Sequence, residues 1–456
     1  MNTPRKAVCS IGAGAGFAGD RIDPAVLLAA SGQVDTVVLE CLAERTLVPA
    51  IKARADNPAA GFDPRLRRRL TPLLQAAAPR RCRIVSNLGA ANPRAAGVAI
   101  ASLAKELGLP GTRVAAIHGD DVMHLREHIA WDRPVEGRLL GAHVYLGSGP
   151  LAQALDAGAD VVVTGRVADS ALFAAAARKH LEPGEAALAG AIAVGHLLEC
   201  AGQLTGGNYE ALSGAGTGTG AGAGTGAGAG AALSAADYAA LAYPLAHVYA
   251  DGSAEITILE GLPGLLDAVT CTLQLLYEVH NPARYATPDL IIDFSAIRFE
   301  QIGRNRILMT GARSLGPPPT LKVAGFLELP GFIADCEIGF AGTGALQRAR
   351  CAADTLRLRL AAWKREDIAI DLVGIDSMLR AGSLPGGAPA ELRVHVSARC
   401  ADADAAQTIE DEIYAMTLCG PAGGCSVRSE RRPRIEVLDG YIAPGLVQAE
   451  IIWSTA

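Results

Sequence analysis

The sequence predicts an α/β protein whose N-terminal parallel βαβ sheet is doubly wound or barrel-like and is followed by a C-terminal α+β domain. Three observations support this. Half of the 456 residues are hydrophobic but only 4% are aromatic, which suits helices packed over buried parallel strands. Strand and helix signals alternate along the first half of the chain. Hairpin and strand signals dominate the second half. A chain of this length should form about two or three domains.

The first half begins with a short apolar strand at 6–11. A helix should follow, with Asp23 as N-cap, Pro24 at its first position and Gly32 at its end. The remaining strands of this half are expected at 34–40, 83–86, 112–118, 143–146 and 159–164. The remaining helices are expected at 93–107, after the strand at 143–146 with its end at Gly158, and at about 170–179.

Within residues 213–232 glycine occupies every even position from 214 to 230, and such a segment cannot build a core. We therefore expect a flexible loop or linker at 213–232, between an α/β domain at 1–212 and an α+β domain at 233–456. An Asp251–Gly252 hairpin opens the latter. Its later strands are expected at 289–294, 306–309, 320–326, 368–372 and 391–397, and its helices at 345–363 and 401–416.

Charge and hydropathy exclude several function classes. With 41 Lys and Arg against 47 Asp and Glu, the net charge is −6, which argues against a protein that wraps nucleic acid. One basic run, at 65–69, is expected to form a solvated helix face. The apolar run at 186–198 is too short to span a membrane. The N-terminal residues resemble no signal peptide, so we expect a cytoplasmic protein without a membrane partner.

The most prominent motif is IGAGAGFAGDRI at 11–22. Gly14, Gly16 and Gly19 fit the G-x-G-x-x-G pattern of dinucleotide-binding loops, and Glu40 lies near the position of a ribose-binding acid. In those loops the glycines lead directly into a helix, whereas here Pro24 delays the helix. The alternative is a long loop, beginning at Gly12, whose backbone N–H groups hold a phosphate or carboxylate.

Polar residues also gather where the predicted strands end, which is where α/β proteins bind ligands. Turn and cap formation explains some of them, such as Asp169 and Asn92, but explains Arg166 less well. The candidate catalytic residues are Asp20, Glu40, Asn87, Asn92, Asp120, Arg166 and Asp169. The candidate cofactor-binding residues are Gly12, Gly14, Gly16 and Gly19.

Other catalytic patterns are weak. The segment His124-Leu-Arg-Glu-His128 fits an inverted zinc-peptidase motif, but a surface helix explains it better because no third ligand is identifiable. The ten cysteines form no C-x-x-C pair and are expected to be reduced core thiols. No metal site is predicted, although acidic strand ends could hold Mg²⁺.

Several segments carry a family resemblance that spans almost the whole chain in order. They are IGAGAGFAGDRI at 11–22, VLECLAERTL at 38–47, VSNLGAANPRAA at 85–96, HGDDV at 118–122, GADVVVTGRVADSALF at 158–173, VGHLLECAGQLTGGNY at 194–209, QLLYEVHNPARYATPD at 274–289 and PPPTLKV at 317–323. Together they resemble the acyclic terpene utilisation family. The Gly/Ala tract after Tyr209 departs from that family, whose members usually have a short loop there.

The resemblance implies a role in the catabolism of citronellol- and geraniol-type branched acids through acyl-CoA thioesters. It further implies processing of an intermediate of the 3-hydroxy-3-isohexenylglutaryl-CoA type. We therefore expect an enzyme, a lyase or hydratase, that acts on an acyl-CoA thioester or small branched carboxylate. The alternatives are a non-catalytic subunit or binding protein of a catabolic enzyme complex, and a nicotinamide-dependent oxidoreductase.

In the enzyme hypothesis each candidate residue has a role. Arg166 pairs with an anionic oxygen. Asp20, Glu40 or Asp120 is the general acid or base, and Asn87 and Asn92 polarise a carbonyl. The expected partners are a small-molecule substrate, a second copy of the chain and a small accessory subunit. A bound coenzyme A moiety would come with the substrate.

Overall fold

The computed structural model describes residues 5–209, 233–378 and 389–456. The chain forms two compact units. The first comprises Met1–Arg133, Gly141–Gly325 and Asp439–Ala456, and the second comprises Pro134–Leu140 and Phe326–Leu438. This division differs from the predicted domains 1–212 and 233–456. The predicted loop or linker at 213–232 lies outside the described residues.

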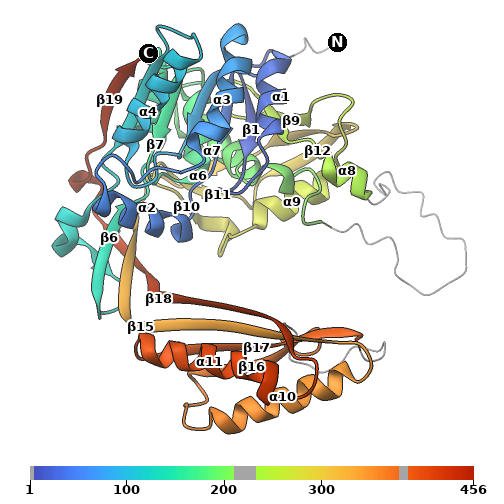
Figure 1. Ribbon diagram of the computed structural model, residues 1–456. Helices are drawn as coiled ribbons and strands as arrows, with labels where there is room; N and C mark the ends of the chain where they lie inside the picture. The colour runs from blue at the N-terminus through green and yellow to red at the C-terminus, as the bar shows by residue number, and fades with distance from the viewer. Residues whose placement is uncertain (1–4, 210–232, 379–388) are drawn as a thin grey trace, which may run out of the picture. The chain divides into compact units, whose positions relative to one another are not determined.

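The first unit contains a sheet of ten strands with five parallel strands at its centre (Figure 1). In spatial order these five are β1 (Cys9–Ala15), β2 (Thr36–Leu39), β3 (Arg83–Ser86), β7 (Val161–Thr164) and β4 (Arg113–His118). β7 lies between β3 and β4, so the order in which the chain adds strands across the sheet reverses at this point. The sheet is open and doubly wound, which settles the choice that the sequence left between an open sheet and a barrel.

Helices cover both faces of these parallel strands. On one face α1 (Asp23–Ser31), α3 (Leu66–Ala77) and α4 (Pro93–Glu106) lie side by side, and on the other α5 (Gly149–Asp156), α6 (Asp169–Arg178) and α7 (Glu185–Leu198) do so (Figure 1). The strands are accordingly mostly apolar, and all four residues of β7 are buried. Burying each valine there contributes about 1.5–3 kcal/mol relative to an exposed side chain.

Antiparallel strands extend the sheet beyond β1 and β4. β8 (Pro244–Val248) pairs with β1, and β9 (Ala254–Ile258) follows it across the predicted hairpin, where Gly252 has a φ of +82°. Because β8 and β9 join the same sheet as β1, residues 233–325 belong to the first unit, although they follow the tract. The outer strands are β13 (Arg306–Thr310) and β12 (Arg298–Gly303) on this side and β19 (Glu450–Thr455) beside β4.

The smaller elements of the first unit connect these strands. They are α2 (Glu44–Asp56), η1 (Ala78–Arg80), η2 (Met123–His128), β5 (Ala130–Trp131), η3 (Ala201–Gln203), α8 (Ala235–Ala239), α9 (Ala268–Leu276), η4 (Pro282–Arg284), β10 (Tyr285–Ala286), β11 (Ile291–Asp293), β14 (Arg313–Ser314) and η5 (Pro444–Leu446). Along the described chain, no helix combines the length and apolar character needed to cross a membrane.

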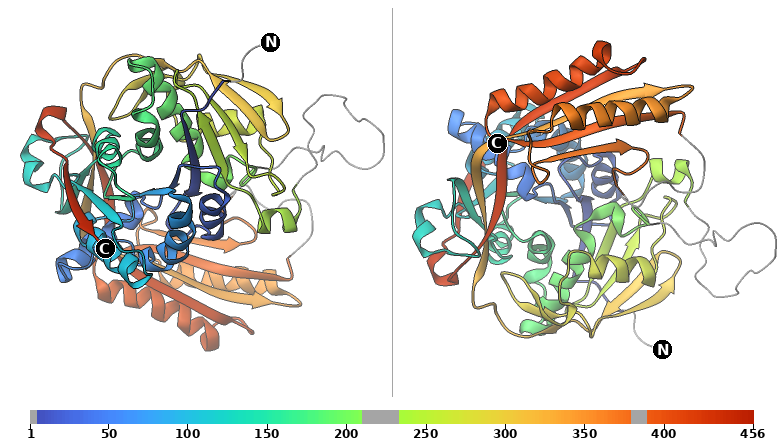
Figure 2. Two further views of the ribbon diagram at one scale, coloured as in Figure 1. Left: turned by 90° about the horizontal axis from the view of Figure 1, so that it is seen from above. Right: turned by 90° about the horizontal axis from the view of Figure 1, so that it is seen from below.

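The second unit has the predicted α+β organisation. Its antiparallel strands are β16 (Ile368–Val373), β17 (Glu391–Cys400), β15 (Leu321–Ala341) and β18 (Cys425–Ile442), with β6 (Arg138–Val144) paired to β15. The helices α10 (Ala345–Arg359) and α11 (Ala403–Cys419) pack on one face of these strands (Figure 2). Their buried side chains, such as Leu356 and Ile409, meet Val394 and Val396 of β17 in a separate apolar core.

Candidate functional site

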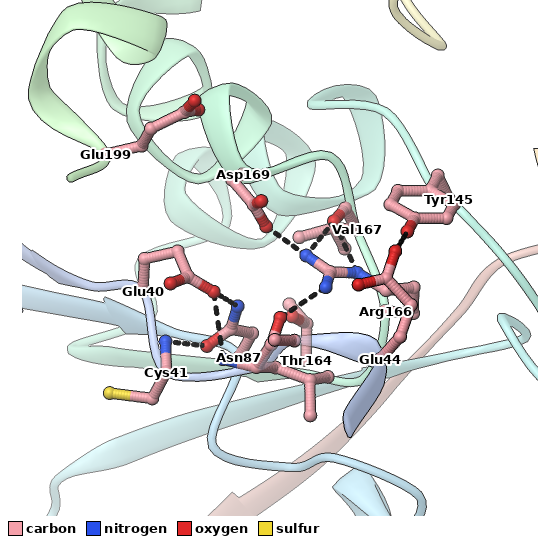
Figure 3. A network of polar contacts seen from close by, with 12 residues as sticks. Glu40, Cys41, Glu44, Asn87, Tyr145, Thr164, Arg166, Val167, Asp169 and Glu199 are labelled. Atoms are coloured by element: carbon pink, nitrogen blue, oxygen red, sulfur yellow. Dashed lines mark hydrogen bonds and ion pairs between the residues drawn. The ribbon is translucent and has the colours of Figure 1, made fainter. Parts of the chain in front are cut away.

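The carboxyl ends of β2, β3 and β7 carry a buried polar network (Figure 3). Glu40 follows β2, and its Oε1 accepts a hydrogen bond of 2.9 Å from Asn87 Nδ2 at the end of β3. The same oxygen accepts the backbone N–H of Leu42 at 2.8 Å, and Asn87 Oδ1 accepts the N–H of Cys41 at 2.6 Å. The parallel register places these two strand ends side by side, so Glu40 and Asn87 hold each other in fixed orientations.

Arg166, two residues after β7, is only 1% exposed. Its Nε and Nη2 donate to the carbonyl oxygen of Val167 at 2.9 and 2.7 Å, and its Nη1 donates to that of Leu42. Nη2 also pairs with Oδ1 of Asp169. The guanidinium lies 4.8 Å from the centre of the Tyr145 ring. Each of its three nitrogens thus has a partner within the chain.

Asp169 is the first residue of α6, one turn from Arg166, and its side chain is 36% exposed. Burial, reinforced by the Glu199 and Glu44 carboxyls and opposed by Arg166, raises the pKa of Asp169 to about 7. Burial and the Asp169 carboxyl likewise raise the pKa of Glu40 well above its ordinary value. Two neighbouring carboxyls therefore favour their neutral form more than a free carboxyl does.

The neighbours of the Glu40 and Asp169 carboxyls include one cation, Arg166, and one further carboxyl, Glu44. Burial works against the charge of Arg166, but Asp169, Tyr145, Glu40 and Glu44 hold its pKa above the ordinary value. For Glu44, burial raises the pKa, but the hydrogen bond from the Tyr145 hydroxyl, a backbone hydrogen bond and the nearby cations together lower it below its ordinary value. Arg166 is therefore a permanent cation beside carboxyls that titrate in different pH ranges.

Glu199, after α7, adds a further carboxyl that the sequence did not suggest. It is 9% exposed, its Oε1 lies 2.9 Å from His196 Nδ1, and its Oε2 has no hydrogen-bond partner among the described residues. The His196 ring in turn lies against Tyr285 and Phe294. Glu199 and His196 lie within the segment 194–209 that carries the family resemblance, and that is the signal that could have found them. Tyr145, also missed, lies outside the segments that carry the resemblance.

The comparisons with known proteins agree with this resemblance. The model of the family described as acyclic terpene utilisation family protein AtuA matches residues 9–453. The chain belongs to this family. No curated protein and no solved structure matches it. The match includes the strand ends that form the Arg166 network and also the whole of the second unit.

For this member of the acyclic terpene utilisation family, the sequence analysis expected Arg166 to pair with an anionic oxygen but did not identify which one. The partner is Asp169, because the start of α6 brings residue i+3 back to the guanidinium. Asp120 instead accepts the backbone N–H of Arg166 at 2.8 Å and lies 2.8 Å from His143 Nδ1. A Cβ at Gly165 would lie 2.4 Å from Asp120 Oδ2, so only glycine fits this turn.

Two other predicted residues hold local structure and share no described hydrogen bond with the Arg166 network. Asn92 is the N-cap of α4: its Oδ1 accepts from Ala95 N–H at 3.2 Å, and its Nδ2 donates to two backbone carbonyls. Asp20 accepts the N–H groups of Gly16 and Arg21 at 2.8 and 2.7 Å and the hydroxyl of Tyr243. Both residues are satisfied by the chain itself.

The glycine motif at 11–22 was expected to form a loop beginning at Gly12, and the structure differs from this expectation. Gly12 and Gly14 lie in β1, which extends to Ala15, and not in a loop. A Cβ at Gly14 would approach Val37, Leu39 and Ala25 to within 2.7–2.9 Å, and one at Gly16 would lie 2.6 Å from the Cys200 backbone. These glycines allow α1, β2 and the segment after α7 to approach β1.

The loop after β1, which contains Gly19, is held by a residue of the basic run. Arg69 is 2% exposed and donates to the carbonyl oxygens of Ala18 and Asp20 at 2.7 and 2.9 Å. The expectation of a wholly solvated basic face is thus wrong at this position, because the Arg69 side chain points inward from α3. Across the described residues, no cluster of three or more acidic, histidine or cysteine side chains has a geometry that could hold a metal ion.

Proposed function

We propose that this chain is a catabolic enzyme that acts on an acyl-CoA thioester or a small branched carboxylate, as a lyase or hydratase. Membership of the acyclic terpene utilisation family supports a catabolic role. The reaction type is supported by one observation: Asp169, partly open to solvent, has a pKa raised to about 7 beside the buried Arg166. A carboxyl that titrates near neutral pH can both accept and return a proton.

The proposed chemistry begins with proton abstraction by the Asp169 carboxylate. In a dehydration, the C–H bond next to the thioester carbonyl breaks and its electron pair forms the new double bond. The C–O bond to the 3-hydroxyl breaks, and the hydroxide leaves as water with a proton from a neighbouring acid. The raised pKa of Glu40 favours its neutral form, which limits the negative charge beside the site. Addition of water is the reverse sequence.

Arg166 acts in this scheme as a positioning residue. Its nitrogens bind Asp169 and the carbonyls of Leu42 and Val167, so the guanidinium fixes the Asp169 carboxyl at the start of α6. Asn87 similarly orients Glu40. A preorganised pair of this kind needs no rearrangement when a proton is transferred.

The test is a panel of branched 3-hydroxyacyl-CoA and enoyl-CoA thioesters incubated with the purified protein, with products identified by mass spectrometry. Asp169→Asn should abolish turnover. Asp23→Asn is the matched control, because Asp23 is also the first residue of a helix and pairs with an arginine, Arg21, but lies outside the network. Binding without turnover would favour the non-catalytic subunit, and reduction of added NAD would favour the oxidoreductase. Either result would contradict the proposal.

A further inference from the structure

The carboxyl of Glu199 is a buried group that the proposed chemistry does not use. Glu199 is 9% exposed and directly follows α7. At this end α7 packs closely on α6, since a Cβ at Gly195 would lie 2.4 Å from the Ser170 carbonyl oxygen. Glu199 lies about one helical turn beyond Gly195. Because Asp169 directly precedes Ser170, the carboxyls of Asp169 and Glu199 lie at neighbouring helix ends (Figure 3).

Glu199 shares one proton with His196. The Nε2 atom of His196 lies 3.2 Å from the carbonyl oxygen of Leu275, and because a carbonyl can only accept, Nε2 carries a hydrogen. Nδ1 lies 2.9 Å from Glu199 Oε1, and a single proton fills this contact, either on the ring or on Oε1. The rings of Tyr285 and Phe294 lie 5.0 and 5.4 Å from the His196 ring. In both arrangements the other oxygen, Oε2, bears no proton and can only accept.

Oε2 of Glu199 is thus an acceptor without a donor. It is buried, and none of the described residues gives it a hydrogen bond. An unpaired buried acceptor is unfavourable, more so on a charged group, and it can mark a contact that a ligand completes. The last torsion of a glutamate is broad, so a turn of the carboxyl can present Oε2 to a ligand beside Asp169, whose side chain is 36% exposed.

We propose that Glu199 Oε2 accepts a hydrogen bond from a hydroxyl group of the ligand beside Asp169, and that this contact selects hydroxylated substrates. The inference rests on the proposed function, in which the substrate is a 3-hydroxyacyl thioester. Next to the reacting carbon of such a thioester, the hydroxyl is the one hydrogen-bond donor. Glu199 orients this hydroxyl, and Asp169 takes the proton from the carbon beside it.

The test compares two thioesters that differ in one hydroxyl, 3-hydroxy-3-methylbutyryl-CoA and 3-methylbutyryl-CoA. Both are titrated calorimetrically into full-length protein that carries Asp169→Asn, so that binding is measured without turnover. The hydroxylated thioester should bind at least about tenfold more tightly. Adding Glu199→Met should abolish this preference, because it removes both oxygens. Adding Glu199→Gln should retain part of it, because the amide keeps an acceptor oxygen without the charge.

Glu185→Gln is the matched control, because Glu185 is an exposed glutamate at the opposite end of α7. It should keep the full preference. Thermal melts show which variants fold, and if Glu199→Met does not, Glu199→Gln carries the comparison.

Two results would overturn the inference alone. They are equal binding of the two thioesters by the parent protein, and equal weakening of both by the Glu199 variants, which indicates a merely structural role. Neither result affects the turnover proposed for Asp169, which is measured by its products. Binding of neither thioester would overturn the proposed function together with this inference.

Discussion

Arg166 combines a permanent charge with almost complete burial, and this makes it a structural residue of the site. Its nitrogens bind Asp169 and two backbone carbonyls. The sequence indicated its importance, because a charged residue directly after an apolar strand needs a partner. It could not identify that partner, because the distance to Asp169 depends on where α6 begins.

Replacing Arg166 with alanine should therefore destabilise the folded protein. Removing one member of a buried ion pair costs about 3–5 kcal/mol. At about 2–4 °C per kcal/mol, the melting temperature should fall by about 6–20 °C. The measurement is a thermal melt of the protein without ligand, with Arg68→Ala as the control for loss of an exposed arginine. A melting temperature within about 2 °C of the wild type would show that the internal contacts contribute little.

Asp169 should make stability depend on pH in a defined direction. Its pKa is about 7 in the folded protein, against an ordinary value of 3.8. Between these values the folded state holds a proton that the unfolded state has released. The stabilisation from this proton is complete below about pH 4 and is lost as the pH rises through 7.

Asp169→Asn removes this titration. The melting temperature of the variant relative to the wild type should therefore rise between about pH 4 and 7 and then level off. Melts of both proteins at several pH values measure this difference. A constant difference across the range would mean that the Asp169 pKa is not raised.

At the scale of elements, the glycines of β1 illustrate what the sequence could and could not predict. The alternation of short, mostly apolar strand segments with helical segments correctly indicated βαβ units, because strands buried on both faces are rich in apolar residues. The glycine spacing at 12–19 fits two structures: a loop that binds phosphate, or a strand that other segments of the chain approach closely. Only the position of Leu39 against β1 and of Cys200 behind Gly16 distinguishes them, and both are set by long-range packing.

A pair of glycine substitutions tests this packing role. Gly14→Ala would place a methyl group within 2.9 Å of Val37, Leu39 and Ala25, and overpacking of this kind costs about 1–3 kcal/mol. Gly19→Ala would meet only the exposed ring of Phe17, at 3.1 Å, which can move aside. Gly14→Ala should thus lower the melting temperature while Gly19→Ala leaves it nearly unchanged. Equal melting temperatures for the two variants would contradict the packing account.

At the scale of the whole molecule, local patterns correctly indicated the element types but did not give the division into units. The tract at 213–232 suggested a domain boundary, yet β8 and β9 return to pair in the sheet of β1. No local signal records such a pairing, because it joins residues more than two hundred positions apart. The same reason explains why Glu40 and Asp169, from distant segments, were both candidates without being recognised as neighbours.

The assembly state is a prediction at this scale. Half of the residues are hydrophobic and only 19% are charged, so we expect a homo-oligomer, most simply a symmetric dimer. Light scattering of the purified protein at micromolar concentration measures the mass directly. A mass equal to that of one chain would overturn this prediction.

The most direct test of the proposed proton transfer at Asp169 is deuterium exchange from heavy water into the carbon next to the carbonyl of a branched acyl-CoA thioester, followed by mass spectrometry across a pH series. The wild type should catalyse exchange with a rate that rises through about pH 7, as Asp169 loses its proton. Asp23→Asn should behave identically, and Asp169→Asn should be inactive at every pH. Undiminished exchange by Asp169→Asn, or its absence from the wild type, would contradict the assignment of Asp169 as the base.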